Sequence, residues 1–155
     1  MILGIDPGVA NVGWAVVNDG VMIEGGVIVT GVKIDSGLRL KKIKEELVEI
    51  LKKYDIKAAG IESLFFAKNA KSAIKVAEAI GVIKLTIAEA GVSVKELTPL
   101  QVKMAIVGYG RAEKRQVLEM VKVMLGGQEV AGPSHVGDAV AVALTVELGQ
   151  RSQML

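Results

Sequence analysis

The sequence predicts an α/β fold in which a five-stranded mixed sheet carries helices on both faces. Two observations support this prediction. Short apolar runs rich in β-branched residues fill most of residues 1–30 and are separated by turn formers, which is typical of an antiparallel meander. From residue 36 onward, segments of helical period alternate with further short apolar runs, which is typical of β–α–β crossovers and parallel strands.

The antiparallel part consists of three strands, expected at residues 2–6, 12–17 and 21–30. The first strand has the sequence ILGID and is ended by the turn formers Pro7 and Gly8. The second and third strands flank Asn18, Asp19 and Gly20, which form a strong hairpin signal because Asp-Gly tolerates positive φ.

The crossover part begins with a helix from Ser36 to about Tyr54, in which apolar residues share one face and Lys and Glu share the other. Thr98 and Pro99 suit a later helix start, because proline fits the first turn. The remaining elements are expected as strands at 57–62 and 92–97 and helices at 70–90, about 99–106, 113–125 and 134–150. Since no linker or repeat interrupts this order, residues 1–155 are expected to form a single domain.

The composition predicts an aliphatic core, because 51% of the residues are hydrophobic and only 3% are aromatic. The chain holds no cysteine, which excludes disulfides and thiolate metal sites and fits a reducing cytoplasm. The opening MILGIDPG lacks the basic start of a signal peptide, and the apolar runs fall far short of the roughly 20 residues that span a bilayer. We therefore expect a cytoplasmic protein without a membrane partner. The net charge of +2 does not by itself indicate nucleic-acid binding.

Two acids stand at strand ends, where ligands of α/β sheets collect. Asp6 ends the first strand and Glu62 ends the fourth, so they converge if these strands are neighbours. Two ionised carboxylates about 4 Å apart repel by roughly 4 kcal/mol at an effective dielectric of 20. Such a pair requires a raised pKa or a bound cation, whereas either acid alone is equally consistent with a turn or helix cap.

The stretch PSHVGDAVAVAL adds a second pair of candidate ligands. His135 and Asp138 are three residues apart and share a face in the first turn of an apolar helix, with Ser134 as its expected N-cap. Oxygen ligands with one imidazole suit Mg²⁺ or Mn²⁺, and two such ions about 4 Å apart support phosphodiester hydrolysis. The alternative for His135 is an ordinary surface or hydrogen-bonded histidine.

Four motifs together resemble the RuvC family of Holliday junction resolvases, and they cover nearly the whole chain: LGIDPGVANVGWAVV, IESLFFAKNAKSA, QVKMAIVGYGRAEKRQV and SHVGDAVAVAL. The resemblance implies an RNase H-like fold, a homodimer, four-way junction DNA as substrate, and Mg²⁺ or Mn²⁺ as cofactor. It also implies that Asp6, Glu62 and Asp138 are catalytic metal ligands. His135 falls on the remaining position, as a direct ligand or as a residue that orients water.

The resemblance also explains the paired phenylalanines of the FFAKNA segment. Phe65 matches the aromatic residue that RuvC proteins insert near the junction crossover, where a ring can replace a stacking partner at about 1–3 kcal/mol per base. Burial in the core is the alternative for Phe65, and more so for Phe66.

Basic residues form two clusters that we expect to bind DNA. The first stands at the start of the long helix and the second surrounds the glycine-rich GYGRAEK segment; the members are Lys68, Lys71 and Lys75, and Lys103, Arg111, Lys114 and Arg115. By the resemblance, Lys103 and Lys114 contribute to both DNA binding and cleavage.

Gly81 lies inside the long helix, where glycine costs about 1 kcal/mol relative to alanine. This suggests close packing there, against either the sheet of the same chain or the same helix of a second subunit. A two-fold dimer would present two equivalent sites to the two opposed strands of a junction and leave paired nicks with 5′-phosphates and 3′-hydroxyls. The resemblance adds a branch-migration motor as a possible partner.

Three other functions remain open. An RNase H-like nuclease of the YqgF type, acting on RNA, would keep Asp6 and a late aspartate but would have no evident need for the FFAKNA segment. A nucleotide-binding domain related to actin and sugar kinases would require two facing domains. A non-catalytic junction-binding protein would not require all of the expected acids.

Overall fold

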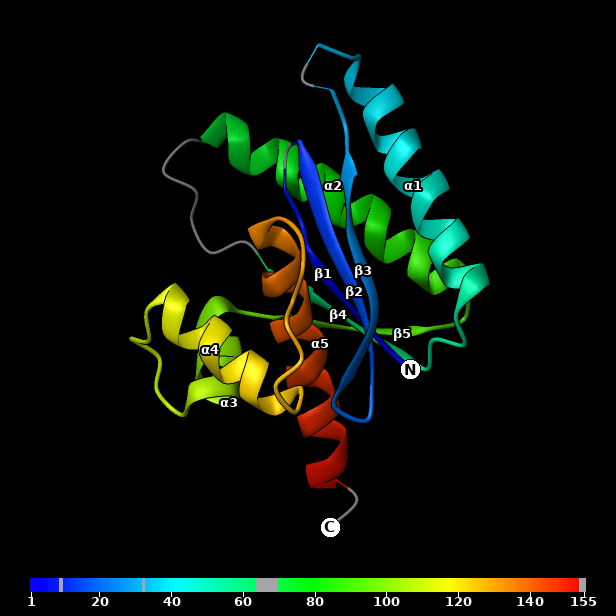
Figure 1. The fold of residues 1–155 in the computed structure, drawn as a ribbon. Coiled ribbons are helices and arrows are strands. Elements are labelled where there is room, and N and C mark those ends of the chain that lie inside the picture. The colour runs from blue at the N-terminus through cyan, green and yellow to red at the C-terminus, as the bar shows by residue number, and fades with distance from the viewer. Residues whose placement is uncertain (9, 32, 64–69, 154–155) are drawn as a thin grey trace.

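The computed structural model describes residues 1–8, 10–31, 33–63 and 70–153, apart from the side chains at 70, 71 and 153 (Figure 1). Its centre is a five-stranded sheet in the order β3-β2-β1-β4-β5. The β1–β2 and β2–β3 pairs are antiparallel, whereas β1–β4 and β4–β5 are parallel, so the predicted mixed sheet is confirmed. The strands are β1 Ile2–Asp6, β2 Asn11–Asn18, β3 Val21–Val29, β4 Ala58–Glu62 and β5 Ser93–Leu97.

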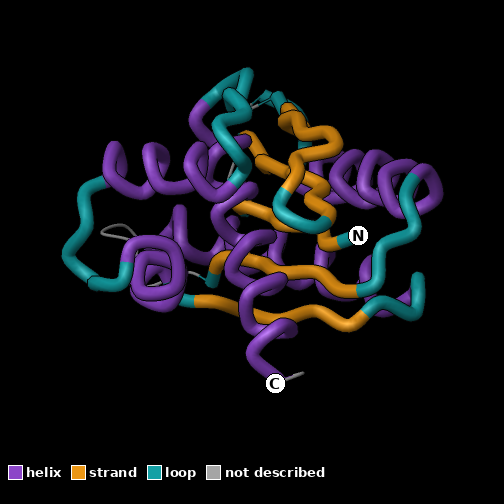
Figure 2. Tube along the Cα trace, turned by 60° about the horizontal axis from the view of Figure 1, so that its bottom comes forward, coloured by secondary structure: helices purple, strands orange, loops and turns teal. Residues whose placement is uncertain are grey.

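Helices cover both faces of the sheet (Figures 1 and 2), as predicted. On one face α5 packs against β1, β2 and β4, and α3 and α4 pack against α5. On the other face α1 and α2 close a second hydrophobic core. The helices are α1 Ser36–Lys53, α2 Ala70–Glu89, α3 Pro99–Val107, α4 Lys114–Met124 and α5 Ser134–Gln153. No helix within the described residues is long and apolar enough to cross a lipid bilayer.

Local signals place the element ends close to their expected positions. Asp19 and Gly20 have φ angles of 50° and 74°, as the predicted tight hairpin requires. The Thr98 side chain accepts a hydrogen bond from the backbone N–H of Gln101 in a capping box, with Pro99 in the first turn of α3. Ser134, expected as the N-cap, is instead the first residue of α5, a difference of one position.

Three glycines allow the backbone of α5 to lie directly on the sheet. A Cβ added at Gly4 would lie 2.0 Å from the Ala139 carbonyl oxygen, and one at Gly13 would lie 2.3 Å from the His135 carbonyl oxygen. At Gly60 the added atom would be 2.6 Å from Cγ2 of Val146. These separations are too short for any larger residue at the three positions. The glycines therefore set the short distance between α5 and the strands.

Gly81 does not pack closely against its own chain. A Cβ added there would meet nothing within 4 Å, and the residue is exposed on α2. The interpretation that Gly81 faces the sheet of the same chain is therefore wrong, because the buried face of α2 is formed by other residues, including Ala79, Ile83 and Ile87.

Candidate metal centre

The parallel pairing of β1 and β4 brings Asp6 and Glu62 to the same edge of the sheet. Ile5 pairs with Ile61, so the following residue on each strand stands at the carboxyl end of its strand. Side chains alternate along a strand, and Asp6 and Glu62 have the same parity as Gly4 and Gly60, which face α5. Both carboxylates therefore lie on the α5 side, as the predicted convergence requires.

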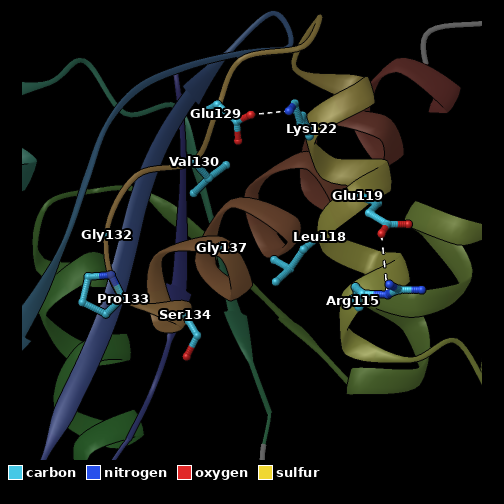
Figure 3. A pocket seen from close by; sticks show the side chains of 10 residues that line it. All are labelled: Arg115, Leu118, Glu119, Lys122, Glu129, Val130, Gly132, Pro133, Ser134 and Gly137. Carbon is cyan, nitrogen blue, oxygen red and sulfur yellow. Dashed lines mark hydrogen bonds and ion pairs between the residues drawn. The ribbon is translucent and has the colours of Figure 1, made fainter.

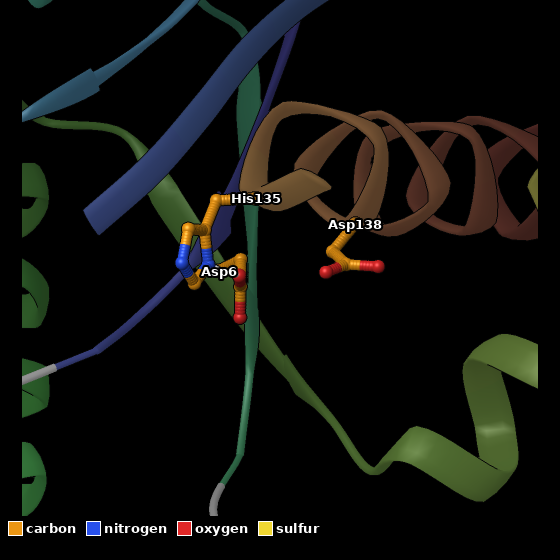
Figure 4. Close-up of side chains that lie close together, drawn as sticks. All are labelled: Asp6, His135 and Asp138. Atoms are coloured by element: carbon orange, nitrogen blue, oxygen red, sulfur yellow. Dashed lines mark hydrogen bonds and ion pairs between the residues drawn. The ribbon is translucent and has the colours of Figure 1, made fainter. Parts of the chain in front are cut away.

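The first turn of α5 supplies the other two candidate ligands. His135 Nδ1 lies 2.8 Å from Oδ2 of Asp6, and one ligand atom from each of Asp6, His135 and Asp138 lies within 4.8 Å of the others (Figure 4). Gly13 is the strand partner of Asp6, and its missing side chain leaves the space that the His135 backbone occupies. Close packing of helix on sheet thus sets the spacing of the cluster.

Burial and neighbouring negative charges raise the pKa values of two carboxyl groups in the cluster. The pKa of Glu62 rises from its ordinary 4.5 to about 7, first because of burial and then because of the Asp6 and Asp138 charges. Burial also raises the pKa of Asp6, and the charge of Asp138 adds to this, while the hydrogen bond from His135 acts in the opposite direction. Burial, and after it the neighbouring negative charges, therefore favours binding of a proton or a metal cation by these acids.

Two lysines face these acids across a shared pocket. Lys114 Nζ lies 2.6 Å from Oδ2 of Asp138, and the positive charges of Lys114 and Lys103 lower the pKa of Glu62. The pocket has a volume of about 240 Å³. Its lining consists of Glu62, Pro99, Val102, Lys103, Lys114, Val117, Asp138 and Ala141. Acidic and lysine side chains thus border one open space. Such a space suits a negatively charged ligand that binds together with a metal ion.

The donor set fits a hard divalent cation. Carboxylate oxygens are the usual ligands of Mg²⁺ and Mn²⁺, and one imidazole is compatible with either ion. Asp6, His135 and Asp138 present such atoms on one side of the site, with side chains that are 14%, 38% and 27% exposed. Glu62 borders the same acids and stands close enough for their charges to raise its pKa. An ion can therefore reach the cluster from solvent and satisfy its charge.

Of the other predicted DNA-binding residues, those that the structure describes lie outside the metal pocket. Arg115 is paired with Glu119 at 3.6 Å and lines a separate pocket between α4 and the start of α5 (Figure 3). Lys75 lines a cleft between α1 and α2, and Arg111 is exposed in the segment between α3 and α4. Phe65 and Lys68, together with the Lys71 side chain, lie outside the described part of the chain.

Two features of the site were missed by sequence reasoning. Gly4, Gly13 and Gly60 position α5, and the available signal was glycine inside strand patterns, which often marks close backbone approach. The direct contact between Lys114 and Asp138 joins residues 24 apart in the chain, and no local pattern predicts it.

Comparison with known proteins gives one consistent result. The sequence model of the family described as Crossover junction endodeoxyribonuclease RuvC matches residues 2–146. A protein of that name from Treponema denticola is 46% identical over 96% of this chain and 86% of its own length. The protein of the same name from Roseiflexus sp. is 45% identical over 92% of this chain and 87% of its own length.

Solved structures agree with the sequence relatives. The Thermus thermophilus RuvC structure in complex with Holliday junction substrate matches with a TM-score of 0.90 and 34% identity, over 98% of this chain and 95% of that one. The yeast mitochondrial Holliday junction resolvase Ydc2 matches with a TM-score of 0.61 over 99% of this chain and 86% of its own, but only 13% identity, and so supports the fold alone. The predicted RNase H-like fold is thereby confirmed.

Proposed function

The chain belongs to the RuvC family of crossover junction endodeoxyribonucleases, and on that premise we propose that it resolves four-way DNA junctions by hydrolysing one phosphodiester in each of two opposed strands. The observation that carries the proposal is the cluster of Asp6, His135 and Asp138, with Glu62 beside it and Lys114 across the pocket. The Thermus thermophilus relative whose structure contains a Holliday junction substrate supports the choice of DNA.

We assign the catalytic and metal-binding roles to Asp6, Glu62, His135 and Asp138. Asp6, His135 and Asp138 hold the divalent cation, Mg²⁺ or Mn²⁺, and Glu62 completes the set from the neighbouring strand. When bound, such cations supply the charge that favours an ionised water as nucleophile and stabilises the leaving oxygen. A count of two cations per site in the presence of DNA is part of the proposal, because Mg²⁺ commonly combines few carboxylates with substrate phosphate oxygens.

His135 has a second task in this proposal. Its Nδ1 contacts Asp6, so the ring is oriented by a residue that is itself a ligand. That contact holds the imidazole beside the cluster, as a ligand or near-ligand, and fixes which ring nitrogen remains available. The catalytic contribution of His135 is then to keep Asp6 and the attacking water in a reproducible arrangement.

Lys103 and Lys114 receive the scissile phosphate. Lys114 is paired with Asp138, and that pair partly neutralises the acid cluster when no cation occupies it. With Asp138 serving as a metal ligand, the ammonium group of Lys114 would be free to pair with a phosphate in the pocket that both residues line. Arg111, Arg115, Lys68, Lys71 and Lys75 are proposed to contact phosphates further along the junction arms, and Phe65 to stack at the crossover.

The active form is proposed to be a homodimer through α2. Ile74 and Leu85 are 61% and 57% exposed, and Ala77 and Gly81 are exposed between them at helical spacing. The open space at Gly81 allows a second helix to approach closely, which offsets the helix propensity lost by glycine. Two copies related by a two-fold axis offer one metal centre to each of two opposed strands.

We further propose that residues 1–155 act as one nuclease domain in the cytoplasm. The match of the family model to residues 2–146 supports the first part, and the absence of cysteine is consistent with the second. A branch-migration motor is the proposed protein partner.

The test is Mg²⁺-dependent cleavage of a synthetic four-way junction, beside a linear duplex and an RNA hairpin of similar length. We expect paired nicks in the junction alone, with 5′-phosphate ends that ligase seals. Asp6→Asn serves as the inactive variant and Glu46→Gln as the control, because Glu46 is a surface residue of α1 that pairs with Lys42. Cleavage of the RNA hairpin in place of the junction would contradict the proposal and favour a YqgF-type activity.

A further inference from the structure

An exposed apolar surface lies on α3 and the residues just after it, beside the metal pocket. We call it the α3 ledge and define it by Leu100, Met104 and Tyr109, which are 59%, 50% and 45% exposed. The backbone of Gly110 lies over the first two, because a Cβ added there would be 2.0 Å from Cδ1 of Leu100 and 3.9 Å from Sδ of Met104. Tyr109 directly precedes Gly110 and is also exposed.

The α3 ledge is continuous with the metal pocket. Lys103 lines that pocket, and it stands three residues after Leu100 and directly before Met104 on α3. Residues three apart are neighbours on a helix, so the Leu100 and Lys103 side chains border one another. A strand whose phosphate contacts the pocket can therefore run on across Leu100 and Met104.

Charges border the ledge on two sides. Lys103 and Lys114 stand at the pocket, and Arg111 follows Gly110 in the chain. Phosphates alternate with sugars along a nucleic-acid strand, so an apolar surface between cations matches sugar rings between phosphates. A protein partner would not require this alternation, and the charge pattern therefore favours a strand of nucleic acid.

We propose that the α3 ledge packs against the sugars next to the cut phosphate and thereby selects deoxyribose over ribose. The inference rests on the proposed function of the metal centre. The C2′ atom of deoxyribose carries only hydrogens and is compatible with contact to Leu100 and Met104. A ribose would instead press its 2′-hydroxyl against these side chains, where the hydroxyl loses its hydrogen bonds to water.

The experiment compares an all-DNA junction with the same junction carrying one ribonucleotide next to the cut phosphate. We expect the wild-type protein to cut the substituted junction roughly ten-fold more slowly. Leu100→Gln and Met104→Gln should bring the two rates to within about three-fold, because an amide accepts and donates hydrogen bonds and glutamine keeps the helix propensity. Comparing the rate ratio between variants cancels any intrinsic effect of the 2′-hydroxyl on the scissile bond.

Val123→Gln is the matched control, because Val123 is 68% exposed and stands nine residues, or about 13 Å, along α4 from Lys114. It should retain the ten-fold ratio. Equal rates for the wild-type protein, or unchanged ratios in both ledge variants, would overturn the inference and leave the ledge as a surface for a protein partner. Failure of the wild-type protein to cut the all-DNA junction would count against the proposed function instead.

Discussion

Replacing Glu62 with glutamine should make the metal-free protein more stable at alkaline pH. The pKa of Glu62 in the folded protein is about 7, whereas its ordinary value is 4.5. A folded state that raises an acid's pKa prefers the protonated form, so ionisation of that acid opposes folding. The penalty is absent below pH 4.5, develops between pH 4.5 and 7, and is complete above pH 7.

The size of the effect follows from the same two values. A rise from 4.5 to about 7 corresponds to about 3 kcal/mol, and partial exposure of Glu62 reduces this to about 1–2 kcal/mol through solvent screening. For a chain of 155 residues that is about 2–8 °C in Tm. Glutamine has nearly the same shape and no charge, so Glu62→Gln removes the penalty without leaving a cavity.

The assay is thermal unfolding in EDTA at pH 4.5 and pH 8.5. The Tm of Glu62→Gln should match that of the wild-type protein at pH 4.5 and exceed it at pH 8.5. Glu46→Gln should show no such difference between the two pH values, because Glu46 is a half-exposed residue of α1, which packs on the opposite face of the sheet from α5 and the acid cluster. A Tm difference for Glu62→Gln that does not change with pH would refute the reasoning, since it would mean that folding does not raise the pKa of Glu62.

Three further predictions follow from the structure and a fourth, on Phe65, from the sequence. Asp6→Asn and Asp138→Asn should each abolish cleavage while junction affinity stays within about three-fold, because lysine and arginine side chains bind the phosphates. Loss of the gel shift in both variants would contradict this. Gly13→Ala should lower both Tm and cleavage, because its methyl group would lie 2.3 Å from the His135 carbonyl oxygen, and an unchanged Tm would show that α5 is not held at that height. Gly81→Leu should shift the protein from dimer to monomer in sedimentation with little change in helix content, whereas a persistent dimer would remove α2 from the interface. Phe65→Ala should reduce cleavage more than Tm; a large fall in Tm would place the ring in the core.

The fold and the acids were predictable because local patterns encode them. The hydrophobic period changes from two to 3.6 near residue 36, and the turn and cap residues Asp19, Gly20 and Thr98 stand where the elements end. Asp6 and Glu62 were recognised as a pair because both end strands, and His135 and Asp138 because they share a helix turn. Each inference needed only residues within one element, or the rule that parallel strands end at one edge.

The remaining features depend on which elements meet, and sequence periodicity does not report this. Gly81 suggested close packing, but its partner cannot be identified from α2 alone, and the structure excludes the sheet of the same chain. The Lys114 contact with Asp138 requires the start of α4 to lie over the start of α5. Arg115 follows Lys114 in one predicted basic cluster, yet it lines a separate pocket, because consecutive residues of a helix point about 100° apart. Lys75 lines a further cleft between α1 and α2.

The three strand glycines connect stability with chemistry. The acids of the metal centre repel one another, and without a constraint α5 would move away from Asp6 and Glu62 to relieve that repulsion. The middle of α5 opposes this movement, because Ala139, Val140, Ala143 and Leu144 are at most 1% exposed and Ala139 and Ala143 lie directly over Gly4. Burial of such side chains contributes about 25 cal/mol per Å² of apolar surface, which over one helix exceeds a repulsion of a few kcal/mol. The apolar packing of α5 therefore holds the carboxylates together against their mutual repulsion, and a bound metal cation would reduce that repulsion.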